Sequence, residues 1–404
     1  MTELKRTLSL TQCVLFGIGS ILGAGIYVLV GKVAGWSGNM AWLAFLLASL
    51  TALTTAFSYA ELSAMYPRSG GEYVYADKAF GQRSGIMLGS LIALSGIVTA
   101  AAVALGFAGY LGMLTGLDMT AGALGILLLL FLVNVSGIRE SSAVNAVFTI
   151  AEALGLFLVI FSSLSLSEGK AEPAYGAETR GILTGASLAF FATIGFEKVV
   201  KLAEEAKAPE RNIPRALFIS TAIISVLYIL VAYFSVRAVS PEELAASESP
   251  LATVVRNGLG YEAAMAISII ALFSTSNTVL ADMLGSSRIV YHMGREIGFL
   301  KLFSWVSPGR QTPIPALLLV FVSASLITLI GNVETAARFA ALFVFAAFVI
   351  IHLCVIALRV KEKTRERPYR MPVNVLNVPV ISVAGILLTM ILLGYNIYSL
   401  LTEA

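Results

Sequence analysis

Apolar segments long enough to cross a membrane recur along the whole chain. A helix needs about 20 mostly apolar residues to cross the hydrocarbon core of a bilayer. With that window, eleven spans are predicted, at about 9–31, 39–64, 84–113, 120–137, 143–166, 181–205, 213–237, 259–291, 314–331, 334–359 and 377–401. Charged residues make up only 13% of the chain, half the share usual in soluble proteins. The chain is therefore expected to be an all-α polytopic membrane protein.

The basic residues predict which ends of these spans face the cytoplasm. If the N-terminus is cytoplasmic, 21 Lys and Arg residues fall on the inner side and 6 on the outer side, as the positive-inside rule requires. The odd number of spans then places the C-terminus outside. The N-terminus leads directly into a full-length span without a small-residue cleavage site, so no cleaved signal peptide is expected. We expect an integral protein of the cell membrane.

This charge distribution accounts for the net charge of +3. We therefore expect membrane lipid around the protein, no nucleic-acid partner, and no obligatory protein partner.

The first span is interrupted by glycines at Gly17, Gly19, Gly23 and Gly25. Each glycine costs roughly 1 kcal/mol relative to alanine in a helix. In a membrane, an unwound backbone is tolerated only where protein or a cavity surrounds it. Broken spans of this kind bind substrates in transporters. An alternative is that the glycines only allow close helix packing.

A second break is predicted in span six, at Thr193, Ile194 and Gly195. Glu197 would then begin the inner half-helix, where its carboxylate can cap free amides and complement the helix dipole. Spans one and six are five apart and therefore antiparallel. We expect a single transporter domain, 1–404, made of inverted repeats at about 9–166 and 181–359 plus an extra helix at about 377–401.

Four motifs in order resemble the amino acid–polyamine–organocation superfamily of amino-acid permeases, close to its cationic amino acid transporter branch. They are the broken first span at 17–31, the second-span exit and re-entrant loop at 59–62 and 67–81, the sixth span and its loop at 191–214, and the end of span eight at 287–296. The resemblance covers roughly residues 5–400 and implies the same five-plus-five fold. Many relatives have a twelfth span.

The broken helices predict a site for the main chain of an amino acid. The upper half of span one begins near Ala24 and Gly25, whose free amides would hold an α-carboxylate close to Gly23. Freed carbonyls of span one and span six would accept from the α-ammonium group. These are the carbonyls of Ile21, Phe191, Ala192 and Ile194. The resemblance implies the same assignment.

Two side chains beside the second break bear on the side chain of the substrate. Phe191 lies on the substrate side and is either an outer gate or plain packing. Thr193 stands where relatives often carry an aromatic ring, so the resemblance leaves side-chain specificity open.

Charged side chains inside spans are expensive and are candidates for ion coupling. Glu152 in span five and Asp282 in span eight lie at similar depths. The resemblance places Glu152 where several proton-coupled relatives carry a lysine. Either Glu152 carries a proton, or it holds a cation such as Na⁺ together with Ser274, Thr275 or Asp282. A third interpretation pairs it with a hydroxyl or with His352, which itself is more readily explained as a satisfied histidine.

We interpret the sequence as that of a secondary active amino-acid transporter, proton-coupled and working by alternating access. An amine or polyamine transporter and an exchanger of the same fold remain alternatives, and a channel or receptor is a further one. The chain contains no Gly-x-x-x-x-Gly-Lys-Ser/Thr loop and no nucleophile–base or metal-ligand cluster, so an enzyme is not expected, nor a cofactor or metal other than the coupling ion.

Overall fold

The computed structural model describes residues 6, 8–68, 71–135, 142–164, 166, 178–296, 298–307, 312–330 and 332–402. Its main helices are α1 (Leu10–Leu22), α2 (Ala24–Ser37), α3 (Ala41–Met65), α4 (Gly71–Phe80), α5 (Gln82–Thr115), α6 (Met119–Val135), α7 (Ser142–Leu164), α8 (Thr179–Thr193), α9 (Pro209–Ala238), α12 (Tyr261–Glu296), α13 (Ile314–Ile330), α14 (Val333–Lys361) and α15 (Val380–Thr402). Short 3₁₀ segments are η1 (Gly38–Met40), η2 (Phe196–Leu202) and η3 (Gly298–Ser304).

Each predicted span coincides with helix in the described part of the chain. Span one is divided into α1 and α2, and span six into α8 and η2. Seven helical stretches are long and apolar enough to cross a membrane, one of them joining α2 to α3, and the remaining spans appear as shorter apolar helices. The prediction of an all-α polytopic membrane protein is confirmed.

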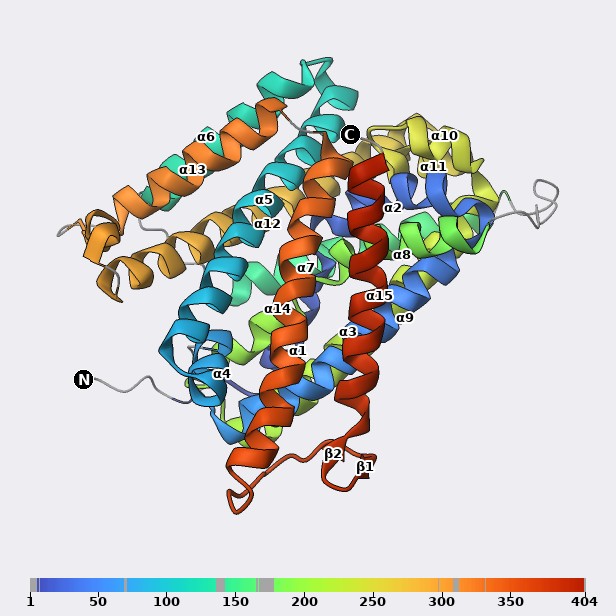
Figure 1. The fold of residues 1–404 in the computed structure, drawn as a ribbon. Helices are drawn as coiled ribbons and strands as arrows, with labels where there is room; N and C mark the ends of the chain where they lie inside the picture. Colours follow the sequence, from blue (N-terminus) through green and yellow to red (C-terminus); the bar gives the residue numbers. More distant parts are fainter. Residues whose placement is uncertain are drawn as a thin grey trace.

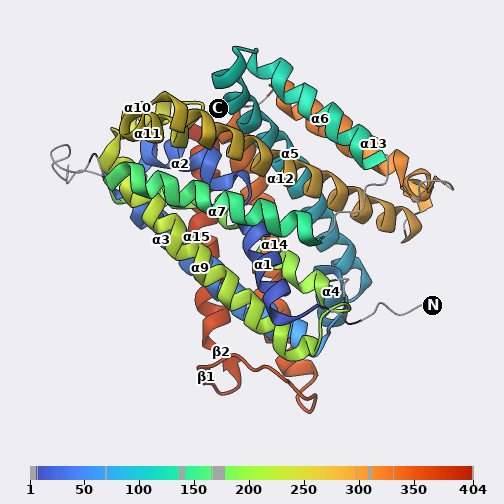
Figure 2. The ribbon, with the colours of Figure 1, turned by 180° about the vertical axis from the view of Figure 1, so that it is seen from behind.

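Helices five spans apart pack against each other. The pair α3 and α9 lies on one side of the molecule, the pair α6 and α13 lies on the other, and α5 crosses α12 between them (Figures 1 and 2). If the chain consists of two related halves of five spans each, every span of the first half has its counterpart five spans further along the chain, and the observed pairs are such counterparts. The inverted repeat stays a prediction.

Small elements occupy the two ends of the bundle. The helices α10 (Pro241–Ala246) and α11 (Pro250–Leu259) lie at the end where the C-terminus is found, and the hairpin of β1 (Asn374–Val375) and β2 (Val378–Pro379) lies at the opposite end (Figure 1). The helix α15 runs from the hairpin to the C-terminal end, packed beside α14.

Candidate functional site

The break in the first span is a single residue, Gly23. The helix α1 ends at Leu22, and Gly23, with φ −35° and ψ −168°, lies outside both the helical and the extended regions before α2 begins at Ala24. Gly23 provides no side-chain cap for the first amides of α2. The first N–H groups of a helix have no partner within it and favour an anion. The start of α2 is thus suited to a carboxylate, where the sequence predicts it.

The break in the sixth span occupies Ile194 and Gly195. Ile194 is extended, with ψ 139°, and Gly195 has φ 128°, a value that glycine adopts readily and other residues rarely. The Gly195 N–H donates to Oε2 of Glu197 at 2.8 Å. Glu197 therefore caps the break, as predicted from its position. The Thr193 hydroxyl donates to the Phe190 carbonyl at 2.8 Å, so this side chain is turned back onto its own helix.

The two breaks are in direct backbone contact. A Cβ atom added at Gly25 would overlap Cα of Ala192, and one added at Gly195 would overlap the carbonyl of Ser20 and lie 3.2 Å from Cα of Ile21. The predicted main-chain site, from Ile21 to Gly25 and from Phe191 to Ile194, is thus brought together at one place. Glycine is required here because any side chain would separate the helices.

Glycine at position 23 allows a third helix to approach this place. A Cβ atom there would overlap Oγ1 of Thr278 on α12. The span-one break is therefore enclosed by span six on one side and span eight on another, which makes it a junction of three spans.

Three tyrosines, which the sequence does not single out, fix the backbone around the first break. Tyr228 Oη donates to the carbonyl of Ile21 at 2.7 Å, and Tyr110 Oη donates to the carbonyl of Tyr27 at 2.6 Å. Tyr27 Oη in turn donates to the backbone carbonyl of Glu152 at 2.8 Å. In this conformation, one lone pair of the Ile21 carbonyl is taken, which leaves its second for another donor. The sequence indicates these three hydrogen bonds only through the general rule that a buried tyrosine finds a partner for its hydroxyl.

Glu152, whose backbone carbonyl accepts from Tyr27, is a buried acid. Its side chain is 2% exposed, and Oε2 has no hydrogen-bond partner among the described residues. The hydroxyls of Tyr27 and Tyr228 lie near enough to interact with its charge. Ser274 on α12 lies beside the carboxyl, yet its own Oγ is also without a hydrogen-bond partner among the described residues. A buried polar atom without a partner marks a place where a proton or a ligand is exchanged or where strain is stored.

The other two predicted coupling residues have partners away from Glu152. Thr275 donates its hydroxyl to the carbonyl of Ala271 at 2.7 Å. Asp282 Oδ1 accepts from Lys198 Nζ at 3.1 Å, while its Oδ2 has no hydrogen-bond partner among the described residues. Ser274 and Asp282 are eight positions apart on α12, which is about 12 Å along the helix axis. A single small cation therefore cannot contact Glu152, Ser274 and Asp282 together.

Comparison with known proteins identifies the family. The family model described as "Amino acid permease" matches residues 8–398. The chain belongs to the amino acid permease family. It is 28% identical to the branched-chain amino acid permease BcaP of Bacillus subtilis, covering 97% of this chain and 88% of the relative. It is 30% identical to the methylthioribose transporter of the same organism, over 96% of this chain and 88% of that relative. It is 29% identical to the chloroplastic cationic amino acid transporter 9 of Arabidopsis thaliana, over 89% of this chain and 68% of that relative.

The family assignment makes this permease an integral membrane transporter rather than an enzyme, with small amino-acid-type molecules as its substrates. The predicted family and the predicted transport function are confirmed. The relatives' names differ in what they transport, so they do not assign one substrate to this chain.

An ion-pair network around the buried side chain of Arg338 lies to one side of the breaks. Arg338 Nη2 contacts Glu334 Oε1 at 2.8 Å, and Trp36 Nε1 donates to the same oxygen at 2.5 Å. The Arg338 guanidinium also lies 5.2 Å from the centre of the Trp36 ring and 3.5 Å from the Ser187 hydroxyl. This network, which we call the outer network after the side on which the sequence predicts it, ties α14 to the far end of α2 and to the middle of α8. The charge distribution of the sequence counts Arg338 among the outer basic residues, but the side chain is buried in α14.

A second buried network lies at the opposite end. Glu61 at the end of α3 accepts from Arg359 Nη2 at 2.6 Å and Nε at 2.8 Å, from Arg367 at 3.4 Å and from the backbone N–H of Met371 at 2.9 Å. Arg359 also bonds Asn374 of the hairpin. This inner network joins α3, α14 and the hairpin into one unit.

His352 is a satisfied buried histidine, as the sequence favours. Its Nδ1 lies 2.8 Å from the Ser58 hydroxyl, and its Nε2 lies 3.2 Å from the Thr55 hydroxyl. The ring fits against Gly385 of α15, where a Cβ atom would overlap it. These contacts give His352 the role of joining α3, α14 and α15 rather than a role beside Glu152.

Proposed function

We propose that this permease is a secondary active transporter that binds an amino acid by its main chain at the junction of the two breaks. The α-carboxylate lies against the amides of Ala24 and Gly25, and the α-ammonium group donates to carbonyls of Ile21, Phe191, Ala192 and Ile194. The observation that carries the proposal is the backbone contact of Gly25 with Ala192, because it brings the first amides of α2 beside the carbonyls at the end of α8.

Spans one and six are both divided into halves, and their two breaks lie beside each other. This division allows the halves on either side of the breaks to move separately, which alternating access requires. The inner halves, α1 and η2, are also joined beyond their ends, since the Leu8 N–H donates to the Glu205 carbonyl at 3.0 Å and the Lys207 N–H to the Leu8 carbonyl at 2.9 Å. The outer halves, α2 and α8, pack directly on each other. Each pair can tilt as a unit, and the glycines at the junction serve as hinges. The substrate is thereby exposed first to one side and then to the other.

We assign the coupling ion as a proton carried by Glu152. The carboxyl is buried and retains an oxygen without a hydrogen-bond partner among the described residues, so it has a free position for a proton. The Na⁺ alternative is weaker because Ser274 and Asp282 lie about 12 Å apart along α12, so one ion beside Glu152 could not be held by both. Coupling requires that the proton affinity of Glu152 differ between the two access states.

The proposed topology has a cytoplasmic N-terminus and an external C-terminus in the cell membrane. The distribution of 21 inner and 6 outer basic residues supports it. In the structure, α15 carries the C-terminus to the end opposite the basic hairpin loop (Figure 1). A reporter active only in the cytoplasm, fused after Ala404, is expected to be silent, while the same reporter in the 362–370 loop is expected to be active. The reverse pattern would refute the topology.

Purified permease in proteoliposomes provides the test of function. Amino acids are expected to bind and to be accumulated when an inward proton gradient is imposed, and their decarboxylated amines are expected to bind much more weakly, because amines lack the anion for the α2 amides. Equal binding of an amino acid and its amine would favour a polyamine or amine transporter. Saturable exchange without any response to a gradient would favour an exchanger.

A further inference from the structure

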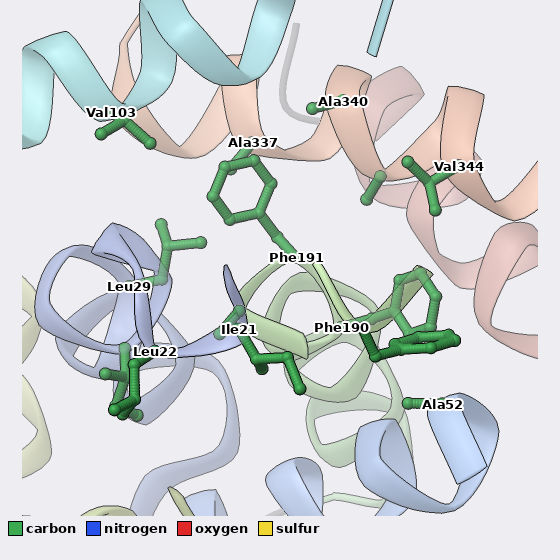
Figure 3. Close-up of a cluster of buried hydrophobic side chains, with 14 of the residues drawn as sticks. Ile21, Leu22, Leu29, Ala52, Val103, Phe190, Phe191, Ala337, Ala340 and Val344 are labelled. Carbon is green, nitrogen blue, oxygen red and sulfur yellow. The ribbon is translucent and has the colours of Figure 1, made fainter. Parts of the chain in front are cut away.

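The hairpin between α14 and α15 exposes a group of apolar side chains. We call this group the apolar hairpin residues; they are Val373, Val375, Leu376 and Val378, with exposed fractions of 61, 61, 95 and 43%. In contrast, Ala337 and Val344 of α14 point into a cluster of buried side chains (Figure 3). An exposed apolar group of this kind marks a surface that meets another partner or a membrane.

The polar side chains of the hairpin are turned toward the protein instead. Asn374 Oδ1 accepts from Arg359, and Asn374 Nδ2 donates to the carbonyl of Met371 at 2.9 Å. Asn377 Oδ1 accepts from Arg370 Nη2 at 2.7 Å. A hairpin that faces water usually packs its apolar side chains on the protein and exposes its polar ones. This hairpin has the reverse arrangement, which suits an apolar environment.

The turn of the hairpin has an unfavourable residue at its first position. Leu376 and Asn377 form the two-residue turn between Val375 and Val378, and both have a left-handed backbone, with φ 48° and 68°. Such turns favour asparagine, aspartate or glycine at these positions, and leucine rarely adopts this conformation. In water, Leu376 is thus unfavourable for its backbone and also for its exposure. Transfer of its side chain into lipid would remove the second cost.

The segment that precedes the hairpin, 361–370, is strongly basic. It contains five basic and two acidic residues, a net charge of +3. Arg365 pairs with Glu362 at 3.1 Å, whereas no acidic group in the described part of the chain forms an ion pair with Lys363 or Arg370. All three of these basic residues are exposed. A cluster of basic residues beside a membrane span attracts anionic lipid headgroups.

The hairpin leads directly into a membrane-spanning helix. The helix α15 begins at Val380 and has 23 residues, about 35 Å at 1.5 Å per residue, against a hydrocarbon core of about 30 Å. Its start therefore lies near the boundary between acyl chains and headgroups. Val380, Val383 and Leu387 form an exposed apolar stripe on this helix, and the apolar hairpin residues extend that lipid-facing surface into the headgroup region.

We propose that the hairpin and segment 361–370 bind the surface of a bilayer that contains anionic phospholipids. The apolar hairpin residues lie among the headgroups and the upper acyl chains, and the exposed basic side chains contact lipid phosphates. Because Arg359 bonds both Asn374 and Glu61, lipid bound here is connected to the inner network. This interaction surface is separate from the substrate site and does not depend on which molecule is transported.

A fluorescent label on the hairpin tests its contact with lipid. Bimane is attached to Val375→Cys in the full-length permease, whose own cysteines, Cys13 and Cys354, are buried. In symmetric vesicles, lipids brominated on the acyl chains are expected to quench this label. The same label on Glu366→Cys, in the exposed part of the basic segment, is expected to be quenched by aqueous iodide instead. Quenching of the Val375 label by iodide alone would overturn the proposal and indicate a second protein as the occupant.

Two further substitutions separate the roles of charge and apolar contact. Vesicles of phosphatidylcholine are compared with vesicles that also contain brominated phosphatidylglycerol. Lys363→Gln is expected to lower the preference for the anionic lipid about fivefold, the effect of one basic residue near the surface. Arg256→Gln is the matched control, because Arg256 is exposed on α11 at the opposite end of the molecule. An unchanged preference in Lys363→Gln would refute the assignment to anionic lipid.

Leu376→Asn is expected to reduce quenching of the Val375 label by both kinds of lipid. Asparagine suits the left-handed turn better than leucine does, so the melting temperature in detergent should not fall, and the loss of quenching cannot then be attributed to unfolding. Quenching at the wild-type level in this variant would refute insertion of the hairpin.

Discussion

Lys198 Nζ lies 3.1 Å from Asp282 Oδ1 and connects the inner half of span six to span eight. Lys198 belongs to η2, next to Glu197, which caps the break. The ion pair is partly exposed, at 23% for the lysine and 11% for the aspartate. It therefore lies where η2 must separate from α12 if α1 and η2 tilt as a pair, and we expect it to hold that side closed.

We expect Lys198→Met and Asp282→Asn each to slow uptake by about tenfold while amino-acid binding is retained. Each substitution removes one member of the ion pair, so the charge of the other member stays behind without a partner in a partly buried place. The exchanged pair, Lys198→Asp with Asp282→Lys, should recover part of the rate. Initial uptake rates and binding affinities in the same proteoliposomes measure both effects. Uptake at the wild-type rate in both single variants would show that the pair does not control closure.

Gly25→Val is expected to abolish binding of every amino acid. Its side chain would overlap Cα of Ala192 and force the two breaks apart, so the loss should not depend on the substrate side chain. Gly125→Val on α6 is the control, since a Cβ atom there meets nothing within 4 Å. Isothermal titration or thermal shifts with several amino acids measure the result. Normal binding by Gly25→Val would refute the main-chain site.

Glu152→Gln is expected to lose accumulation driven by a pH gradient while it keeps substrate binding. Glutamine has the shape of the protonated acid but cannot release a proton. If Glu152 instead held Na⁺, uptake at constant pH would require sodium and the variant would lose that requirement. Glu248→Gln serves as control because that carboxylate is half exposed. A Glu152→Gln protein that still concentrates substrate under both gradients would leave Glu152 as a structural acid.

Arg359→Met is expected to lower stability by about 3–5 kcal/mol, because it leaves Glu61 buried beside fewer donors. The double variant Glu61→Leu with Arg359→Met should be more stable than Arg359→Met alone, since the fully buried carboxylate is removed together with its main partner, and only the more exposed Arg367, 3.4 Å from Glu61, loses a contact. Arg365→Met, whose side chain is 43% exposed, should change stability by about 1 kcal/mol or less. Thermal unfolding in detergent compares them. Equal melting temperatures for Arg359→Met and Arg365→Met would contradict this role for the inner network.

The spans and both breaks could be predicted from the sequence because each leaves a local signal. A run of about 20 apolar residues implies a helix that crosses the membrane, and the glycines around Gly23 and at Gly195 indicated where it would be interrupted. The capping role of Glu197 followed from its position two residues after the break. These inferences depend only on neighbours along the chain.

The pairing of distant polar groups could not be predicted in this way. Lys198 and Arg338 appear in the sequence to be ordinary charges near span ends, yet they form ion pairs across helices or within a buried network. The bond between Tyr228 and the Ile21 carbonyl joins residues 207 positions apart. Such contacts depend on the rotation of each helix about its own axis and on the angle at which two helices cross. The hydropathy of the sequence determines neither of these quantities.

Arg338 and Arg359 are buried near opposite ends of α14 and lie 21 positions apart, which is roughly 30 Å along the axis. That separation matches the thickness of the hydrocarbon core. Arg359 is held by Glu61 of α3, whereas Arg338 pairs with Glu334 of α14 itself and is joined through that carboxylate to Trp36 of α2. The helix α14 is thus tied to two different neighbours at two levels that are about one membrane thickness apart. Because sliding α14 along its axis would break the contacts at both levels at once, we expect α14 to stay in place during transport while the broken helices tilt against it.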